Sequence, residues 1–576
     1  SLSLGLGGQG SSGGAGDSVT LNTGGSITTS GAQSQGILAQ SISNGGGVAK
    51  VVIEAAESGA RLTQTSSYTL AGSQLVQANT NNGLAIAAVL GSGSTAVKAA
   101  GAVTVTSASA INTVGVRSAG IVAQSIASGG GVVDVNTTAL NGGDFAADVL
   151  LGGYTKSTGA KVEVTTSGSI VTTGALADGV LAQSINSGGG SFGVSHLSAL
   201  ESGAGTLDFQ LGSNGIDEKI TGEAVTVTAD ASIATEGKGS TAITAQSLGA
   251  GGGLLAFELG SATDGLTVYG RLGSEASHQG KSGAVTVTAN APLSSTGNFA
   301  TLVLAQSIGG GGGRVVGLTG VSTEGQLAFG AGNNGGDGNS VSVTTYDTLE
   351  TTNNYSHGIV AQSIGAGGGL SDLAVASVTF GSSSTAQGVG GDVTVQAGSI
   401  STAGLNALGI VAQSIGGGGG LAVMSKTGVV DFGGDASSSP NGGTVSVSLT
   451  PAEPLSAEGP TIKTAGQASP AVLAMSIGGG GGAALYEDSP ASTSTDPFIS
   501  SGDGGDVSIT LSNSTVSTTG PGSDALVAVS AGSGGGLIIS SSGTTSVSTD
   551  IGSGGVVSIS ISGDSTVSTS QATPIV

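Results

Sequence analysis

The sequence predicts an all-β protein: a right-handed parallel β-solenoid, or β-helix, of about nine repeats with almost no α-helix. Three observations support this prediction. A segment of the type Ile-Val-Ala-Gln-Ser-Ile, as at 121–126, recurs nine times, and a glycine-rich tract follows each copy. Between the copies, short strand-like segments recur in a fixed order, separated by linkers of variable length. Glycine makes up 111 of 576 residues and charged residues only 9%, which fits stacked strands joined by tight turns better than a conventional core.

Residues 1–18 read as a Gly/Ser-rich entry and residues 19–576 as one continuous solenoid. Each repeat begins with a Val-Thr-Val strand such as 103–105, followed by a short Ile-x-Thr segment such as 111–113. The Ala-Gln-Ser strand and its glycines come next, and then a segment that ends in Leu-Gly or Phe-Gly, as at 151–152. A fixed order of strands with variable loops indicates a solenoid, in which each unit stacks on its neighbour.

The Ala-Gln-Ser strand has the pattern of a strand that is buried on both faces. Alternate side chains of a strand point to opposite faces, so its Ala and Ser share one face and its Gln lies on the other. Both faces are apolar or small, whereas a half-exposed strand would alternate apolar and polar residues.

We expect the glutamines to point inward and to hydrogen-bond to one another along the stack, because a buried amide without a partner costs about 1–3 kcal/mol. The alternative is that they are tolerated surface residues, and side-chain exposure decides between the two. Met475 and Val529 replace Gln in the last two repeats, which favours burial. The predicted structural ladder consists of Gln40, Gln124, Gln183, Gln246, Gln306, Gln362 and Gln413.

The number of turns per repeat is open at this stage. Successive glutamines are 51 to 84 residues apart, whereas solenoid coils commonly contain about 20–30 residues. This length favours two or three turns per repeat. One wide turn is the alternative, and it would place the Ala-Gln-Ser strands directly on one another. The glycine tracts, such as 309–313, predict tight corners with positive φ or very close backbone approach.

The segment Gly-Ile-Val-Ala-Gln-Ser-Ile-Gly-Gly-Gly-Gly-Gly at 409–420 resembles the repeat of passenger regions in large autotransporter proteins of Gram-negative bacteria. The copies at 358–369 and 302–313 are similar, and the resemblance covers the nine repeats. It implies an exported β-solenoid, displayed on or released from the outer membrane, with a C-terminal translocator barrel in the full-length protein that this sequence does not include. The absence of Cys is compatible with export.

The charge and composition limit the partners that we expect. The formal net charge of −23 and the lack of a basic stripe argue against nucleic-acid binding. No run of about 18 apolar residues predicts a transmembrane helix in this chain. The remaining candidates are a host or abiotic surface, a glycan, or a second copy of the same chain.

No motif predicts catalysis or a cofactor, so we expect neither a catalytic residue nor a bound cofactor. The three histidines, His196, His278 and His357, do not have metal-ligand spacing. Aspartates beside glycines at strand entries are weak calcium candidates, although the nine-residue period of calcium-binding repeats is absent. Solvated turn residues are the simpler interpretation of these aspartates. The candidates are Asp337, Asp392 and Asp506.

The sequence therefore predicts an extracellular structural or adhesive solenoid rather than an enzyme. A self-assembling filament or matrix subunit is the main alternative, because an uncapped strand can pair with another chain. A glycan-acting β-helix enzyme is a minor alternative, and it would require carboxylates gathered in one groove.

Overall fold

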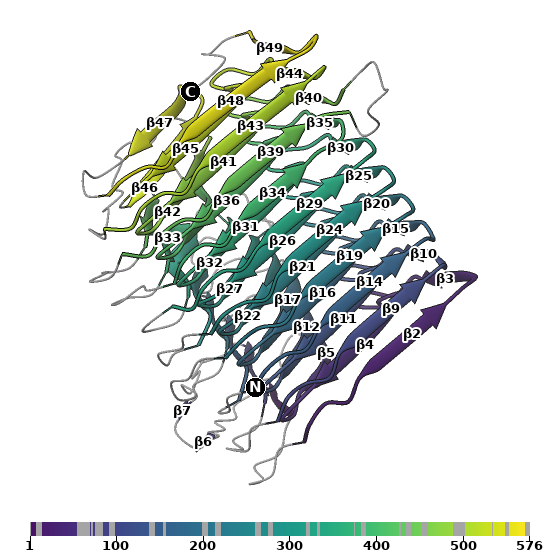
Figure 1. Cartoon of the computed structure of the whole chain (residues 1–576). Coiled ribbons are helices and arrows are strands. Elements are labelled where there is room, and N and C mark those ends of the chain that lie inside the picture. The colour runs from purple at the N-terminus through teal and green to yellow at the C-terminus, as the bar shows by residue number, and fades with distance from the viewer. Residues whose placement is uncertain are drawn as a thin grey trace.

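A computed structural model shows the chain as a stack of parallel strands (Figure 1). No helix occurs in the part of the chain that the structure describes, and therefore no helix there could cross a membrane. The structure describes residues 2–6, 14–53, 69–70, 73–74, 84–91, 98–137, 145–153, 157–197, 205–212, 220–259, 266–274, 280–317, 323–330, 335–373, 375–381, 388–424, 428–433, 439–451, 459–487, 501–532, 534–547 and 552–570.

Five long sheets, which we name A to E in chain order, run the length of the stack. Sheet A contains β1 (Leu2–Leu6), β8 (Leu84–Leu90), β13 (Phe145–Leu151), β18 (Gly205–Leu211), β23 (Leu266–Leu272), β28 (Thr323–Phe329), β33 (Val375–Phe380) and β38 (Val429–Phe432). Sheet B contains β2 (Val19–Thr23), β9 (Val103–Ser107), β14 (Val162–Thr166), β19 (Val225–Ala229), β24 (Val285–Ala289), β29 (Val341–Thr345), β34 (Val393–Gln396), β39 (Val445–Leu449), β43 (Val507–Ser512) and β48 (Val557–Ser562).

Sheet C contains β3 (Ser26–Thr29), β10 (Ala110–Thr113), β15 (Ile170–Thr172), β20 (Ile233–Thr235), β25 (Leu293–Ser295), β30 (Leu349–Thr351), β35 (Ile400–Thr402), β40 (Thr461–Thr464), β44 (Thr515–Thr518) and β49 (Thr566–Thr569). Sheet D contains β4 (Ile37–Ile42), β11 (Ile121–Ile126), β16 (Val180–Ile185), β21 (Ile243–Leu248), β26 (Val303–Ile308), β31 (Ile359–Ile364), β36 (Ile410–Ile415), β41 (Val472–Ile477) and β45 (Leu526–Ala531).

Sheet E contains β5 (Gly47–Ile53), β12 (Gly130–Thr137), β17 (Gly189–Leu197), β22 (Gly252–Leu259), β27 (Gly312–Gly317), β32 (Gly368–Asp372), β37 (Gly419–Met424), β42 (Gly481–Tyr486), β46 (Gly535–Ser540) and β47 (Gly543–Val547). The strands of the five sheets pair in parallel, except that β47 pairs antiparallel with β46. A separate antiparallel pair consists of β6 (Thr69–Leu70) and β7 (Ser73–Gln74). Strand β1 lies within the segment expected to be a loose entry and pairs with β8.

Each sequence repeat makes one turn of the solenoid. Strand β11 pairs directly with β16, and Gln124 is the register partner of Gln183. The same residue-for-residue pairing continues from β4 to β45. The preference for two or three turns per repeat was therefore wrong. We number the turns as coils 1 to 9 by their strand in sheet D, from β4 to β45, with neighbouring coils about 4.8 Å apart.

A single coil is long because it folds into four layers with three apolar cores between them. Sheets B and C pack on one face of sheet D through residues such as Val103 and Ile121. The other face of sheet D packs on sheet E, where Ile126 and its equivalents lie. The far face of sheet E packs on sheet A through residues such as Val133 and Leu151. Sheets D and E are thus internal layers, and the predicted two-sided burial of the Ala-Gln-Ser strand is confirmed.

The glycine tracts form the corner between sheets D and E. Gly129, Gly130 and Gly131 all have positive φ, as do the equivalent glycines of the neighbouring coils. A Cβ atom on Gly130 would overlap the backbone of Gly189 in the next coil. Both physical requirements expected of these glycines are therefore present.

We expect the substitution Gly130→Ala to destabilise the protein by about 2–4 kcal/mol, because it combines an unfavourable φ with a backbone overlap. Gly24→Ala is the matched control, since Gly24 has open space around it and no positive φ. Urea unfolding followed by circular dichroism measures the difference. Equal midpoints for the two variants would contradict this explanation of the glycine tract.

Candidate functional site

The seven glutamines form a continuous ladder between sheets D and E. Six of them are fully buried, and Gln40 in coil 1 is half-buried. Each side-chain Nε2 donates to Oε1 of the glutamine in the next coil, at 2.6–2.8 Å. A second acceptor, a glycine carbonyl in sheet E, lies 3.2–3.3 Å from Nε2 of Gln306, Gln362 and Gln413. The ladder ends where Gln413 Nε2 faces the sulfur of Met475, at 3.6 Å.

The ladder geometry predicts different costs for interior and terminal substitutions. Gln246→Met leaves Gln183 without its acceptor and Gln306 without its donor, so we expect a loss of about 2–5 kcal/mol. Gln413→Met should cost only about 1 kcal/mol, because Gln362 keeps the carbonyl of Gly369 as an acceptor. Thermal unfolding of the two variants measures the contrast. Equal losses would mean that the amides do not act as a chain.

The serine next to each glutamine points to the opposite face, and in every coil but that of Ser184 it bonds to the segments that lead into sheet B. Ser125 Oγ donates to the carbonyl of Gly101 in its own coil and accepts the N–H of Ala160 in the next coil. Ser307 does the same with Gly283 and Asn339. The serine therefore recurs in the repeats because its hydroxyl group bonds to the backbone of its own coil and of the next coil.

The three weak calcium candidates lie in the same kind of position, at the entry to sheet B. Asp392 Oδ1 accepts the N–H of Thr444 at 2.9 Å, and Asp506 Oδ1 accepts that of Val556 at 2.8 Å. Asp337 accepts the N–H of Val389 and forms an ion pair with Lys281. Each carboxylate bonds to the backbone of the following coil. No group of three or more metal-ligating side chains occurs among the described residues.

The two histidines in the described part of the chain, His196 and His357, lie in different coils, 3 and 6. His357 is fully buried between sheets D and E, and its Nδ1 accepts the N–H of Leu408 at 3.2 Å. Burial, with a smaller contribution from Arg314, lowers the pKa of His357 to about 3, so the ring is neutral. His196 is on β17 in sheet E, and His278 lies outside the described residues.

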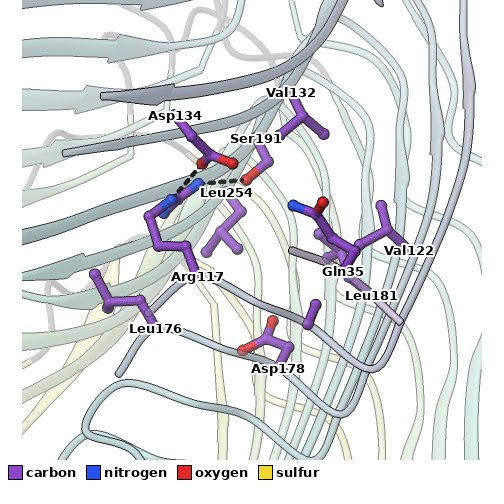
Figure 2. A pocket seen from close by; sticks show the side chains of 11 residues that line it. Gln35, Arg117, Val122, Val132, Asp134, Leu176, Asp178, Leu181, Ser191 and Leu254 are labelled. Atoms are coloured by element: carbon purple, nitrogen blue, oxygen red, sulfur yellow. Dashed lines mark hydrogen bonds and ion pairs between the residues drawn. The ribbon is translucent and has the colours of Figure 1, made fainter. Parts of the chain in front are cut away.

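A buried ionic contact at the start of the D–E layer involves Arg117, Asp134 and Ser191. Arg117 lies in the turn between sheets C and D and has a φ of 56°. Its Nε donates to Asp134 Oδ1 on β12, and its Nη2 donates to Ser191 Oγ in the next coil at 3.3 Å. Figure 2 shows the guanidinium directed at these two side chains. A Cβ atom at position 193 would overlap this guanidinium, so Gly193 provides the space that Arg117 occupies.

Beside this contact is a cavity of about 20 Å³, lined also by Gln35 and Asp178 (Figure 2). Two buried polar atoms of the contact, Arg117 Nη1 and Asp134 Oδ2, have no hydrogen-bond partner. A cavity of this size holds about one water molecule, which could accept from the guanidinium and donate to the carboxylate. The site is too small for an organic ligand.

A second buried contact, in coils 4 to 6, is centred on Arg314 of β27. The side chain is fully buried and pairs with the buried Asp372 on β32, with Nε and Nη2 at 3.1 and 3.0 Å from Oδ2. It also donates to Thr241 Oγ1 and to the carbonyls of Gly239 and Phe299. Burial raises the pKa of Asp372 to about 6, although the guanidinium opposes this rise.

Asp178 joins the two contacts into one polar strip. Its carboxylate accepts the N–H of Thr241 at 2.8 Å and the hydroxyl of Thr244 at 3.1 Å. Burial raises its pKa, and Arg314 and then Arg117 oppose the rise, together with these two hydrogen bonds. The strip is therefore held by a few specific pairs in a layer whose other residues are mainly aliphatic side chains and the glutamine ladder.

One more pair of carboxyl groups occurs in sheet A, where Asp148 and Asp208 are register partners on β13 and β18. Partial burial, and then repulsion by Asp208, raise the pKa of Asp148 to about 6. Burial also raises the pKa of Asp208, and Arg271 reduces that rise. This pair does not line the cavity beside Arg117.

Sequence reasoning found the glutamine ladder but missed the polar strip. Its members are far apart in the chain, since 58 residues separate Arg314 from Asp372. The signal appears only when the repeats are aligned in register. Arg314 then stands opposite Leu254 and Leu370, and Asp372 stands opposite Val316. A charged residue aligned with aliphatic residues of the neighbouring coils is the feature from which the polar strip could have been predicted.

Comparison with known proteins does not add to this description. No family model matches the chain, and the searches of curated proteins and of solved structures found no match. The molecule is identified by its architecture alone, as a parallel β-solenoid of nine one-turn repeats with buried amide and ionic contacts.

Proposed function

We propose that the protein is an extracellular structural or adhesive solenoid. It would resemble the passenger regions that autotransporters display on, or release from, a bacterial outer membrane. The observation that carries the proposal is the unbroken pairing of sheet D through nine coils, with the strands of sheets B to E in the same order in each of them. Such a stack spans about 43 Å at about 4.8 Å per coil. Its function is then mechanical, because a rod of this kind holds its surface and loops at a distance from the cell.

Three further features support this proposal. The polar groups between sheets D and E are mostly engaged with one another, as in the glutamine ladder, and so serve cohesion rather than chemistry. The sequence around 409–420 resembles autotransporter passenger repeats. The net charge of −23 keeps such a rod soluble and apart from anionic surfaces.

Protease treatment of intact source cells tests the proposed location. We expect added proteinase to remove the protein from the cell surface, or the protein to be found in the medium, while a cytoplasmic marker stays intact. Beads coated with the purified chain should then adhere to host cells, glycans or abiotic surfaces above the level of beads coated with albumin. Complete protection in intact cells would contradict the proposal.

A filament or matrix subunit is the second candidate, and one observation favours it. Strand β48 is the outermost strand of sheet B among the described residues, and Val556, Val557 and Ile561 beside or within it are 67%, 44% and 44% exposed there. An open, apolar strand edge pairs readily with another strand. Negative-stain images of the purified chain separate the candidates: short uniform rods support the single solenoid, and long fibres support self-assembly.

A further inference from the structure

Most contacts between neighbouring coils do not distinguish one coil from another. The glutamine, serine and glycine columns, and most positions of the apolar cores, carry the same or similar residues in successive coils. A coil that stacked on the wrong neighbour would therefore form nearly the same ladder. Repetitive strands are prone to alternative pairings for this reason.

Contacts between unlike residues occur at each successive interface from coil 2 to coil 7. Arg117 reaches Ser191 between coils 2 and 3, and Asp178 bonds to Thr241 and Thr244 between coils 3 and 4. The remaining interfaces use Arg314 with Thr241, Arg314 with Asp372, the stacked rings of Phe299 and Tyr355 at 4.7 Å, and His357 with the N–H of Leu408.

We propose that these unlike contacts form a register code, which determines during folding which coil stacks on which. The inference does not depend on the proposed extracellular role. A buried ionic or polar pair adds little net stability compared with apolar residues, but an unpaired partner is strongly unfavourable. Such pairs therefore discriminate between arrangements, as a single buried polar residue does in a coiled coil.

Two incorrect arrangements show how the code operates. If coil 5 were looped out, coil 4 would stack on coil 6, and Asp372 would be buried beside Ala256 without Arg314. If coil 6 were looped out, coil 5 would stack on coil 7, and Arg314 would face Val423 in place of Asp372, since Ala422 is the register partner of Ser371. Both arrangements keep a glutamine ladder and leave a buried charge unpaired.

The test is a variant in which three code residues are replaced by residues that other coils carry at the same positions. Asp178→Ala follows Ala119, Arg314→Leu follows Leu254, and Asp372→Val follows Val316. Because the chain has no cysteine, disulfide formation during refolding reports stacking without background.

Cysteines at positions 228 and 288 lie in neighbouring coils 4 and 5, whereas cysteines at 228 and 344 lie in coils 4 and 6. The second pair is about 9.6 Å apart in the native stack, too far for a disulfide. In the unmodified background we expect the 228–288 pair to cross-link and the 228–344 pair to stay reduced. In the triple variant we expect cross-linking of the 228–344 pair to rise about tenfold or more, with native-like circular dichroism retained.

Arg117→Leu with Asp134→Gly provides an independent second variant, following Leu176 and Gly193, and its reporter is the 106–228 pair in coils 2 and 4. Val343→Ala, a core truncation in sheet B, is the control for general destabilisation and should leave the 228–344 cross-link low. Unchanged cross-linking in both variants would overturn the proposal. So would a triple variant that cannot reach the native fold, because the pairs would then be needed for stability rather than for the choice of neighbour.

Discussion

The substitution Arg314→Met is expected to destabilise the protein by about 3–5 kcal/mol, among the largest effects of any single side-chain change. Asp372 would keep its buried carboxylate and lose its cation, and Thr241 and the carbonyl of Phe299 would lose a donor. Lysine should not rescue the loss, because one ammonium cannot reproduce the planar set of donors that the guanidinium directs to these acceptors. Guanidinium chloride unfolding measures the effect.

The surface ion pair of Lys161 and Glu163 supplies the matched control. Its side chains are 51% and 41% exposed, so Lys161→Met should change the stability by less than about 0.5 kcal/mol. In a solenoid each coil contacts only its neighbours, so hydrogen exchange in Arg314→Met should accelerate first in coils 4 to 6. Adding Asp372→Val to Arg314→Met should recover most of the loss. A double variant as unstable as the single one would show that the contact is not governed by the unpaired charge.

The main features of the fold could be predicted from the sequence because each recurring residue type occupies the same structural position in every repeat. The Ala-Gln-Ser pattern predicts a strand buried on both faces, and the Leu-Gly and Phe-Gly ends mark the strands of sheet A. The number of turns per repeat could not be predicted in this way. The chain folds back from sheet D to sheet E and, in coils 1 to 7, continues into sheet A, and this folding depends on contacts between layers that no local pattern reveals.

The candidate site likewise has a part that could be predicted from the sequence and a part that could not. Gln124 and its equivalents could be predicted because a repeated polar residue in a buried strand satisfies itself with copies of itself. Arg117, Asp178 and Arg314 could not be, because each is satisfied by a different residue type on another coil. Contacts between unlike residues depend on which coil stacks on which. They can be recognised in the sequence only once the register of the repeats is known.

The buried imidazole of His357 should make the protein sensitive to acid, and this is the second large effect. Its pKa is about 3 in the folded protein and about 6.5 in an unfolded chain, so the folded state excludes a proton that the unfolded state accepts. Its contribution to stability is complete above pH 6.5 and is lost progressively as the pH falls towards 3. Between pH 7.5 and 4.5 the loss amounts to about 3 kcal/mol.

Asp372 acts in the opposite direction. Because its folded pKa of about 6 lies above the ordinary value of 3.8, acidification from pH 7.5 to 4.5 relieves a buried charge and stabilises the fold by about 2 kcal/mol. The two groups face the same Arg314 in the D–E layer. The contributions of His357 and Asp372 oppose each other, and the raised pKa values of Asp148, Asp178 and Asp208 add further stabilisation on acidification, so we expect no net loss of stability in the unmodified protein over this range.

Single substitutions should therefore expose opposite pH dependences. His357→Leu, for which Leu408 in the next coil is the precedent, removes the acid-sensitive group and should become more stable on acidification. Relative to the unmodified protein, Asp372→Val should lose about 2 kcal/mol of stability over the same range, because the contribution of Asp372 is removed. Urea unfolding at pH 7.5, 6.0 and 4.5 measures both, with Thr301→Val at the equivalent position of coil 5 as the non-titrating control. Parallel pH profiles for the unmodified protein and His357→Leu would show that the imidazole is protonated in the fold, which its buried position beside Arg314 should prevent.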